Sequence, residues 1–494
     1  MRRLALAPLV LALPSAASVT LGGCLVDRTA LDGRDGGTND PDVYVAPGTD
    51  ADLDAPARPD ATSDAWLDPT FDAWQPDAWA PDAWVPGPDA WTGGDAWAPD
   101  AFSPDAAAMC TEPHCEGDEL VACDGTRTRC GLCETGPARC VELVPSNVPT
   151  GFVFNATALA TDIAVSGTVT WNTGNCDSAH IAVDSGGAPM MLLSHPDQPG
   201  SAGEVCLFAA NSFTFTAGAN VQVIGTRPLV LLARDRIELA TGAVLSAASP
   251  NTPGGNCALD RTGAGSGTGG NVGADGTGND GGGGGGGFFG LGGDGGDGGG
   301  TGGGGGAGSA PSSMTLVPLV GGADGGSGHG GTGGFAGPGG GAIQLSAPRI
   351  TLHGVVEAFG GGGGGGSAMN AGGGGGSGGG VHVEALVLDA AGGAIDVRGG
   401  AGGGGGCSGR GQCGGQNPAP DAMSGGPANG TCAGNGGAGA GDGSVSGDPG
   451  ETASSNGGGG GGGAGAVVVR QYRSSAPVTT YPDGVLSSAT VTTR

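Results

Sequence analysis

The sequence predicts an all-β protein: a right-handed parallel β-solenoid with long glycine-rich insertions, preceded by a disordered stalk and a small disulfide-rich module. In residues 341–360, apolar side chains such as Ile343 and Leu345 alternate with polar or small ones. This is the period of strands that bury one face. Residues 228–247 and 380–400 repeat the pattern, and a partial copy follows at 465–472. Runs of glycine separate the copies.

Composition limits both the fold and the function. Glycine supplies 116 of the 494 residues and proline 33, while aromatic residues make up only 4%. Much of the chain is therefore not an ordinary globular domain. The formal charge is −29, and every basic residue is arginine. The charge argues against nucleic acid as a partner. The absence of lysine excludes Walker A nucleotide binding and Schiff-base chemistry.

The amino terminus predicts export. Arg2 and Arg3 precede an apolar run and then small residues, so residues 1–23 are expected to be a signal peptide. The segment 21–24, Leu-Gly-Gly-Cys, resembles the lipobox of bacterial lipoproteins. The resemblance implies that Cys24 is lipidated, that the membrane is a partner through this anchor, and that the protein reaches the outer membrane or cell surface. The alternative is an ordinary secreted protein cleaved near Ala17.

Cysteine usage supports an oxidising compartment. Without Cys24, 12 of the 13 cysteines remain, an even number suited to disulfides. Cys176 and Cys206 are one candidate pair. The disulfide candidates are Cys110, Cys115, Cys123, Cys130, Cys133, Cys140, Cys176, Cys206, Cys257, Cys407, Cys413 and Cys432.

Residues 24–109 are predicted to be a disordered acidic stalk. Between residues 25 and 109 there are 18 aspartates and three arginines, and Asp-Ala-Trp recurs between prolines. Such a chain repels itself and remains extended. The repeats either contact the sugar rings of a surface polysaccharide or have drifted without a ligand. The tryptophans of the repeats are Trp66, Trp74, Trp79, Trp84, Trp91 and Trp97.

Residues 110–140 form the predicted disulfide-rich module. Six cysteines lie within 31 residues. A segment of this length is too short to fold by apolar burial alone, so disulfides are expected to stabilise it. Zinc bound by Cys130, Cys133 and His114 is the alternative, and export favours disulfides. The sequence does not choose among the 15 connectivities that three bridges allow.

Residues 141–494 are predicted to form the solenoid, each copy contributing two or three short strands. Glycine-rich insertions follow Ala247, Phe359 and Arg398, which occupy the same corner of each copy. A stack of similar units completes a core that no unit could bury alone. Residues 151–227 are expected to form a less regular cap. A β-sandwich with very long loops is the rival fold.

The glycine-rich excursions are residues 248–340, 361–379 and 401–464. Disorder is one expectation, because glycine loses much backbone freedom on folding. The other follows from a period of three residues, as at Asp294 and Asp297 or at Phe335 and Pro338. This period matches polyproline-II-type helices, which glycine allows to pack side by side. The second hypothesis also ties Cys257 to Cys407, Cys413 or Cys432.

The motifs for catalysis and metal binding are weak. Gly375-x-Ser377-x-Gly379 matches a nucleophile motif without the strand-to-helix turn it requires, and residues 292–297 match a calcium repeat once and imperfectly. Alternation places His382, Glu384 and Asp396 towards solvent. We expect no catalytic residue, metal or cofactor. The remaining ionisable residues of the repeats are Arg234, Asp235, Arg236, Glu238, Arg349, His353, Glu357, Asp389 and Arg398.

The signal, stalk and glycine tracts together resemble the glycine-rich surface lipoproteins of myxobacteria and their relatives. The glycine tracts are also similar to the polymorphic glycine-rich sequences of mycobacteria. The resemblance implies location and architecture. We expect a non-catalytic, lipid-anchored surface protein with a structural or adhesive role, whose partners include envelope or matrix polysaccharide or neighbouring cells. The alternative is a carbohydrate-binding or polysaccharide-cleaving solenoid.

Overall fold

The structure is a computed structural model. The chain divides into two units, Met1–Ala96 and Trp97–Arg494, and every described residue belongs to the second. The predicted signal peptide, Cys24, the stalk, Cys110 and Cys257 lie outside the described residues. The described residues are 112–149, 161–176, 191–193, 196–199, 203–249, 273, 275–276, 279–299, 304–305, 307–308, 315–329, 333–414, 424–441, 443–474, 477–489 and 493.

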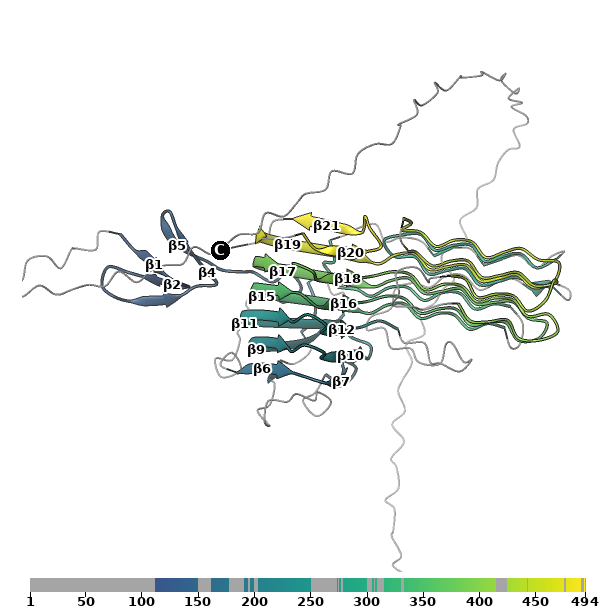
Figure 1. Ribbon diagram of the computed structural model, residues 1–494, viewed down its shortest axis with the longest axis horizontal. Coiled ribbons are helices and arrows are strands. Elements are labelled where there is room, and N and C mark those ends of the chain that lie inside the picture. The colour runs from purple at the N-terminus through teal and green to yellow at the C-terminus, as the bar shows by residue number, and fades with distance from the viewer. Residues whose placement is uncertain are drawn as a thin grey trace, which may run out of the picture. The chain divides into compact units, whose positions relative to one another are not determined.

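The described residues contain strands and no helix, so the all-β prediction is confirmed. Seven strands pair in parallel in the order β21-β19-β17-β15-β11-β9-β6, and β8 (Met191–Leu193) pairs antiparallel with β9. We call this the long-strand sheet (Figure 1). Its parallel strands are β6 (Asp162–Val165), β9 (Cys206–Phe215), β11 (Leu229–Leu239), β15 (Ala342–Leu352), β17 (Gly380–Asp389), β19 (Ala466–Ser474) and β21 (Leu486–Ala489).

A second parallel sheet, the short-strand sheet, has the order β20-β18-β16-β12-β10-β7. The chain alternates between the two sheets, because each long strand from β6 to β19 is followed by a short one. The parallel pairing contradicts the β-sandwich alternative, whose sheets are antiparallel. The short strands are β7 (Thr168–Asn172), β10 (Asn220–Ile224), β12 (Val244–Ser246), β16 (Val355–Glu357), β18 (Ala394–Asp396) and β20 (Thr479–Tyr481).

The core consists of columns of apolar side chains that run across the strands. Leu345 of β15 is in register with Leu231 of β11 and Val383 of β17, and all three are fully buried. On the short strands, Val356 is likewise in register with Leu245 and Ile395. The alternation read from the sequence therefore selects the buried face correctly, and each strand completes its neighbour's apolar surface.

Each copy contains one long bent strand rather than two short ones. The register of β11 shifts between Leu232 and Arg236, so the strand bends without ending. Ala233 lies at this shift and Ala347 lies at the corresponding place in β15. A small residue allows the bend, as the sequence predicts, but the ladder of hydrogen bonds continues past it.

Apart from the antiparallel strand β8, the described residues before Arg227 are more regular than the expected cap. Strands β6, β7, β9 and β10 belong to the same two sheets as the later copies. Their buried side chains, including Phe213, Phe215 and Val221, occupy the same columns. The repeat was not recognised in this part of the sequence, because aromatic residues replace the aliphatic ones of the later copies.

Five further short strands belong to residues 112–149. Strands β1, β2 and β3 form one antiparallel sheet, and β4 pairs with β5 in another. A two-stranded pair, β13 (Asp275–Gly276) and β14 (Asn279–Asp280), precedes the first glycine run. The five strands are β1 (His114–Glu116), β2 (Glu119–Val121), β3 (Arg127–Arg129), β4 (Leu132–Thr135) and β5 (Ala138–Val141).

Candidate functional site

The glycine-rich excursions are ordered wherever the structure describes them. They follow β12, β16 and β18 and return to β15, β17 and β19, and they run side by side at one end of the sheets (Figure 1). The predicted corner is therefore where they leave. We call these segments the glycine bundle: 281–299, 322–329, 333–341, 358–379, 397–414, 424–440 and 446–465.

Backbone hydrogen bonds in the bundle recur every three residues. Gly372, Gly375 and Gly378 donate their amides to segment 457–463, with N–O distances of 3.0, 2.9 and 3.0 Å. A spacing of three is the repeat of a polyproline-II-type helix, in which consecutive residues face three directions. Each segment can therefore bond to several neighbours at once, unlike a β-strand.

The most interior segments are surrounded on all sides. Segment 457–463 exchanges backbone hydrogen bonds with six others, which are 280–287, 291–299, 371–379, 397–406, 433–440 and 446–451. Segment 371–379 is enclosed in the same way. Other backbone segments lie in every direction around such a segment, so almost no room remains for side chains, and the few present are the small ones of Ala371 and Ser377.

Glycine is required by this close approach. A Cβ atom on Gly459 would lie 1.9 Å from the carbonyl oxygen of Gly373, and one on Gly462 would lie 2.0 Å from that of Gly376. The atoms in the way belong to backbone, which cannot rotate aside. Disorder, the first expectation for these runs, is therefore wrong for the described segments, because their hydrogen bonds offset the entropy that glycine loses.

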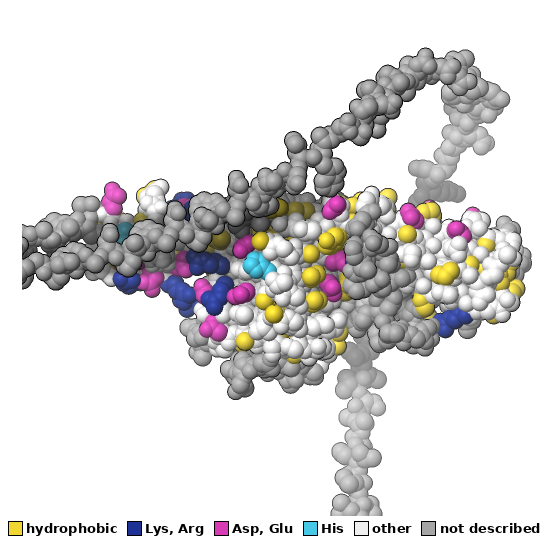
Figure 2. Space-filling view, viewed as in Figure 1, with side chains coloured by type: hydrophobic (Ala, Val, Ile, Leu, Met, Phe, Trp, Pro, Cys, Tyr) yellow, Lys and Arg dark blue, Asp and Glu magenta, His cyan; other side chains and the backbone are white. Residues whose placement is uncertain are grey.

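Side chains appear at the rim of the bundle, with the period of three read from the sequence. Asp294 accepts a hydrogen bond from the amide of Ala307 at 2.8 Å, and Asp297 accepts one from Gly304 at 2.7 Å. Carboxylates at the rim thus bond amides of neighbouring segments. On the face drawn in Figure 2, the surface of the bundle otherwise consists largely of backbone and uncharged residues.

A disulfide joins two turns at the end of the bundle away from the sheets. Cys407 is bonded to Cys432, and Cys413 is disulfide-bonded as well. Of the three partners predicted for Cys257, this bond excludes Cys407 and Cys432 and leaves Cys413. Cys257 itself lies outside the described residues.

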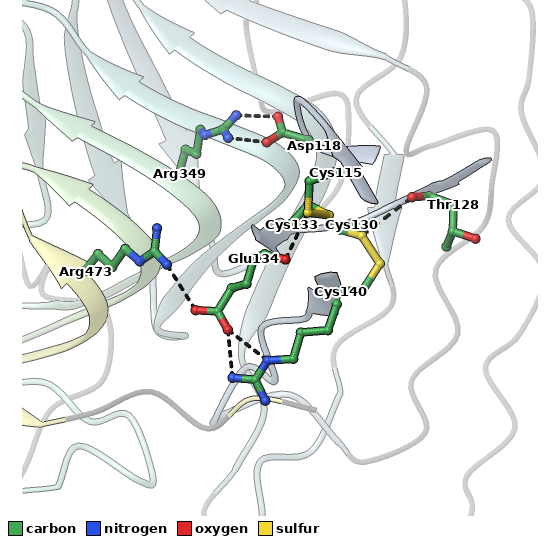
Figure 3. Close-up of a disulfide and its surroundings, with 10 residues drawn as sticks. Cys115, Asp118, Thr128, Cys130, Cys133, Glu134, Cys140, Arg349 and Arg473 are labelled. Carbon is green, nitrogen blue, oxygen red and sulfur yellow. Dashed lines mark hydrogen bonds and ion pairs between the residues drawn. A yellow bond between two sulfur atoms is a disulfide. The ribbon is translucent and has the colours of Figure 1, made fainter. Parts of the chain in front are cut away.

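Residues 112–149 are joined by two disulfides, Cys115–Cys133 and Cys130–Cys140 (Figure 3). Cys123 is also disulfide-bonded. These bonds contradict the zinc alternative, because thiols in a disulfide cannot bind the metal as thiolates. In the core of the sheets, Cys176 and Cys206 form another disulfide, with an S–S distance of 2.08 Å.

Residues 112–149 pack on the outer face of the long-strand sheet. The guanidinium of Arg349 makes a two-pronged ion pair with Asp118, and Arg473 lies 3.0 Å from Glu134 (Figure 3). Leu386, fully buried, belongs to one apolar cluster with Leu132 and Val141. The contact thus combines apolar burial with charge pairing at its margin.

The expectation that His382 and Glu384 face solvent is wrong. They point away from the core, as alternation requires, but His382 is 0% exposed and Glu384 is 1% exposed. Ser146 bonds both oxygens of Glu384, and Asn147 donates to the carbonyl oxygen of Leu316 at 2.8 Å. Segments distant in sequence therefore cover the polar side chains, and alternation within one strand gave no sign of them.

Glu384 is the centre of this buried polar cluster. Its carboxylate accepts hydrogen bonds from Gln344 and Ser346, each at 2.9 Å, and lies 3.8 Å from a guanidinium nitrogen of Arg470. Nε2 of His382 lies 3.6 Å from the carboxylate. Burial lowers the pKa of His382 to about 4, so the imidazole is neutral near pH 7. A carboxylate so fully bonded and enclosed fastens the covering segment rather than serving an external substrate.

Asp396 was expected to face solvent and is also buried. It is 5% exposed and pairs with Arg398, 1% exposed, through a 2.6 Å contact. In register beside it lies Glu357, whose pKa is raised by burial. This group lies on the short-strand sheet and the His382 group on the long-strand sheet, so the two do not share one cleft.

The other ionisable residues do not converge on a site. Asp235 pairs with Arg129 and Arg236, and His353 lies 3.5 Å from Asp389. Ser377 of the rejected nucleophile motif is fully buried, and its hydroxyl oxygen accepts from the amide of Ala323 at 2.7 Å. Among the described residues, no group of three or more His, Cys, Asp or Glu could hold a metal ion.

Sequence reasoning missed the partners in the polar cluster. Gln344 is in register with His382, and Ser346 with Glu384. The signal was present: polar residues alternate with the apolar ones at the same register in adjacent copies. Ser146 and Asn147 had no such signal, because they lie outside the repeats.

Three comparisons, with models of protein families, with curated proteins and with solved structures, found no match to this chain. Within the described ranges there is no helix of the length and apolar character needed to cross a membrane.

Proposed function

We propose that the chain is a lipid-anchored, non-catalytic bacterial surface protein with a structural or adhesive role. In this proposal the two parallel sheets are faces of a right-handed β-solenoid. Cys24 carries the anchor, residues 24–109 act as a spacer, and the disulfide-stabilised residues 110–140 form a module on the solenoid.

The observation that carries the proposal is the glycine bundle. Its interior consists of hydrogen-bonded backbone, and a Cβ at Gly459 would overlap a neighbouring carbonyl. Such an interior offers very few side chains for chemistry, and similar backbone contacts repeated many times set its shape. It suits a rigid body that presents its rim and turns to the surroundings.

The fold buries the residues that the catalytic alternative would use. His382, Glu384 and Asp396 were its candidates, and all three are buried beneath other chain segments or in ion pairs. A polysaccharide-cleaving enzyme needs paired carboxylates in an open cleft. Carbohydrate binding at the surface remains compatible with the display role.

The anchor is tested by surface labelling of the wild-type chain and a Cys24→Ser variant. Because the chain has no lysine, the label must target carboxylates or an added epitope rather than amines. The wild type is expected to be labelled on the cell and the variant to appear in the medium. Retention of the variant on the cell would contradict the anchor.

The structural or adhesive role is tested by deleting the chain. Deletion is expected to reduce cell cohesion, and the purified protein is expected to leave matrix polysaccharide intact. Normal cohesion after deletion would contradict the role. Depolymerisation of polysaccharide that is lost in a His382→Ala, Glu384→Ala variant would favour the enzyme instead.

A further inference from the structure

Met369 occupies a backbone conformation that normally requires glycine. Its φ is 66°, in the left-handed region, and its side chain is 58% exposed. The other described non-glycine residues with positive φ are Cys176, held in a disulfide, and Leu316, 4% exposed within an apolar cluster. Their strain is explained by what their side chains do inside the fold. That of Met369 is not.

A glycine at position 369 would form the same turn without this backbone strain. Glycine adopts positive φ freely, and glycine runs lie on both sides of this turn, at residues 360–366 and 372–376. A methionine here is unfavourable for the backbone and exposes an apolar side chain to water. Residues held in this way cluster at binding sites, where the side chain is used outside the fold. Met369 therefore indicates a contact with another molecule.

Arg410 lies on the adjoining turn. The amide of Met369 bonds the carbonyl oxygens of Gly406 and Cys407 at 3.1 and 3.0 Å, and the amide of Gly411 bonds Gly366 at 2.8 Å. The turns 367–370 and 408–411 are thus fixed together, and we call them the tip patch. Arg410 is exposed, and within the described ranges no carboxylate forms an ion pair with it.

The chemistry of the tip patch selects its partner. A methionine sulfur makes favourable contacts with aromatic rings, and an exposed guanidinium pairs with a carboxylate. The patch therefore suits a peptide that carries an aromatic ring close to a carboxylate. It suits a sugar less well, since Met369 offers neither a ring nor a hydrogen-bonding group.

The chain itself contains this combination repeatedly. In Asp-Ala-Trp the acid and the ring are two residues apart, and an extended backbone places them on one side, roughly 6.6 Å apart. The tripeptide ends at Trp74, Trp79 and Trp84 in one run of five-residue repeats, and the stalk has 18 aspartates against three arginines. Charge and aromatic content both complement the tip patch.

We propose that the tip patch of one copy binds the Asp-Ala-Trp repeats in the stalk of a neighbouring copy. The proposal rests on the display role above and names its partner. Trp rests on Met369 while Asp pairs with Arg410. Repeats along one stalk offer several equivalent sites, so weak single contacts add up between surfaces that carry many copies.

The first test measures binding of a peptide with the sequence of residues 72–84. The receptor is the chain without its own repeat tryptophans, made by Trp66→Ala, Trp74→Ala, Trp79→Ala, Trp84→Ala, Trp91→Ala and Trp97→Ala. Met369→Gly is expected to weaken binding about tenfold, and Arg410→Gln by a similar factor. Met369→Gly also relieves the backbone strain, so lost binding could not be due to unfolding.

Two controls accompany this test. Leu291→Ser removes an apolar side chain that is 54% exposed elsewhere on the bundle, and it is expected to leave binding unchanged. A peptide with alanine at each Trp is expected not to bind. Equal binding by Met369→Gly and the unmodified receptor, or displacement of the peptide by matrix polysaccharide, would overturn the proposal.

The second test asks whether binding joins two copies. The Met369→Gly chain keeps its stalk, and the chain lacking repeat tryptophans keeps its tip patch. In sedimentation velocity neither is expected to associate alone, whereas the mixture is expected to associate. A mixture that stays monomeric, or a wild type that stays monomeric where the mixture associates, would overturn the proposal. Either result would leave the cohesion test of the display role unaffected.

Discussion

Leu345 in β15 and Gly459 in the glycine bundle are both buried, but different forces hold their surroundings together. Leu345 lies in a column of apolar side chains between the two sheets, so removal of hydrocarbon from water stabilises its position. Gly459 has no side chain, and the segment that contains it, 457–463, bonds the backbones of six other segments. Burial of apolar side chains stabilises the sheets. Backbone hydrogen bonds stabilise the bundle, and they form because glycine has no side chain to hold the segments apart.

This difference shows how a chain with little apolar surface can still be ordered. A β-strand bonds two neighbours, whereas a three-fold helix of glycine bonds as many as six. Each additional hydrogen bond offsets part of the entropy that ordering glycine costs. The excursions begin after β12, β16 and β18 and end at β15, β17 and β19, so the sheets hold the ends of neighbouring segments side by side.

The largest expected effect is in the sheets. Leu345→Ala should lower the free energy of unfolding by about 4 kcal/mol, because it opens a cavity in a fully buried column. Chemical denaturation measures this change. Leu291→Ala, at an exposed apolar residue, is the control and should change stability by less than about 0.5 kcal/mol. A small effect at Leu345 would mean that the columns do not form the core.

Adding one carbon to the bundle should be nearly as damaging. Gly459→Ala is expected to destabilise the bundle by about 3 kcal/mol, because its Cβ would lie 1.9 Å from a backbone oxygen. Limited proteolysis of the bundle should detect it. Gly441→Ala places its Cβ 3.8 Å from the nearest atom and should be tolerated. Equal tolerance of both substitutions would contradict the packing.

Lowering the pH should reduce the free energy of unfolding, because His382 is buried in its neutral form. Its pKa is about 4 in the folded chain and about 6.5 in an unfolded one. Between these values the unfolded chain binds more protons, so stability falls as the pH drops below 6.5. From pH 7 to 5 the loss is expected to be about 2 kcal/mol. Burial raises the pKa of Glu357, which contributes with the opposite sign.

The His382→Gln variant isolates this contribution, because Glu357 is present in both proteins. Its free energy of unfolding should fall less steeply than that of the wild type between pH 7 and 5. Urea denaturation at the two pH values measures the difference. Parallel pH profiles would contradict a buried, neutral His382.

The smallest expected effect is at the contact between residues 112–149 and the long-strand sheet. Arg349→Ala removes the ion pair to Asp118, and both side chains are partly exposed. The loss should be about 0.5 to 1 kcal/mol. A double-mutant cycle with Asp118→Ala measures it. Additive effects of the two substitutions would show that the ion pair contributes nothing.

The sequence predicted the strands because their information is local. Ile343 and Leu345 alternate with polar residues, and this alternation determines the buried face wherever copies stack. It also predicted the period of three at Asp294 and Asp297, which the structure places at the rim of the bundle. Local patterns of period two and three were thus sufficient for these elements.

Pairing over long distances could not be read in this way. All the interior glycine runs look alike, so nothing in segment 457–463 specifies its six neighbours. The burial of His382 depends on Asn147 and Leu316, which belong to segments without periodicity. The strain at Met369 follows from the turn between two glycine runs, and its sequence gives no sign of a positive φ.

Amide hydrogen exchange of the glycine runs tests the central claim most directly. Segments 371–379 and 457–463 are expected to be protected to a degree comparable with β15 and β17, because their amides bond buried carbonyl oxygens. Exchange at the rate of an unstructured chain in these two segments, alongside protected strands, would contradict the account.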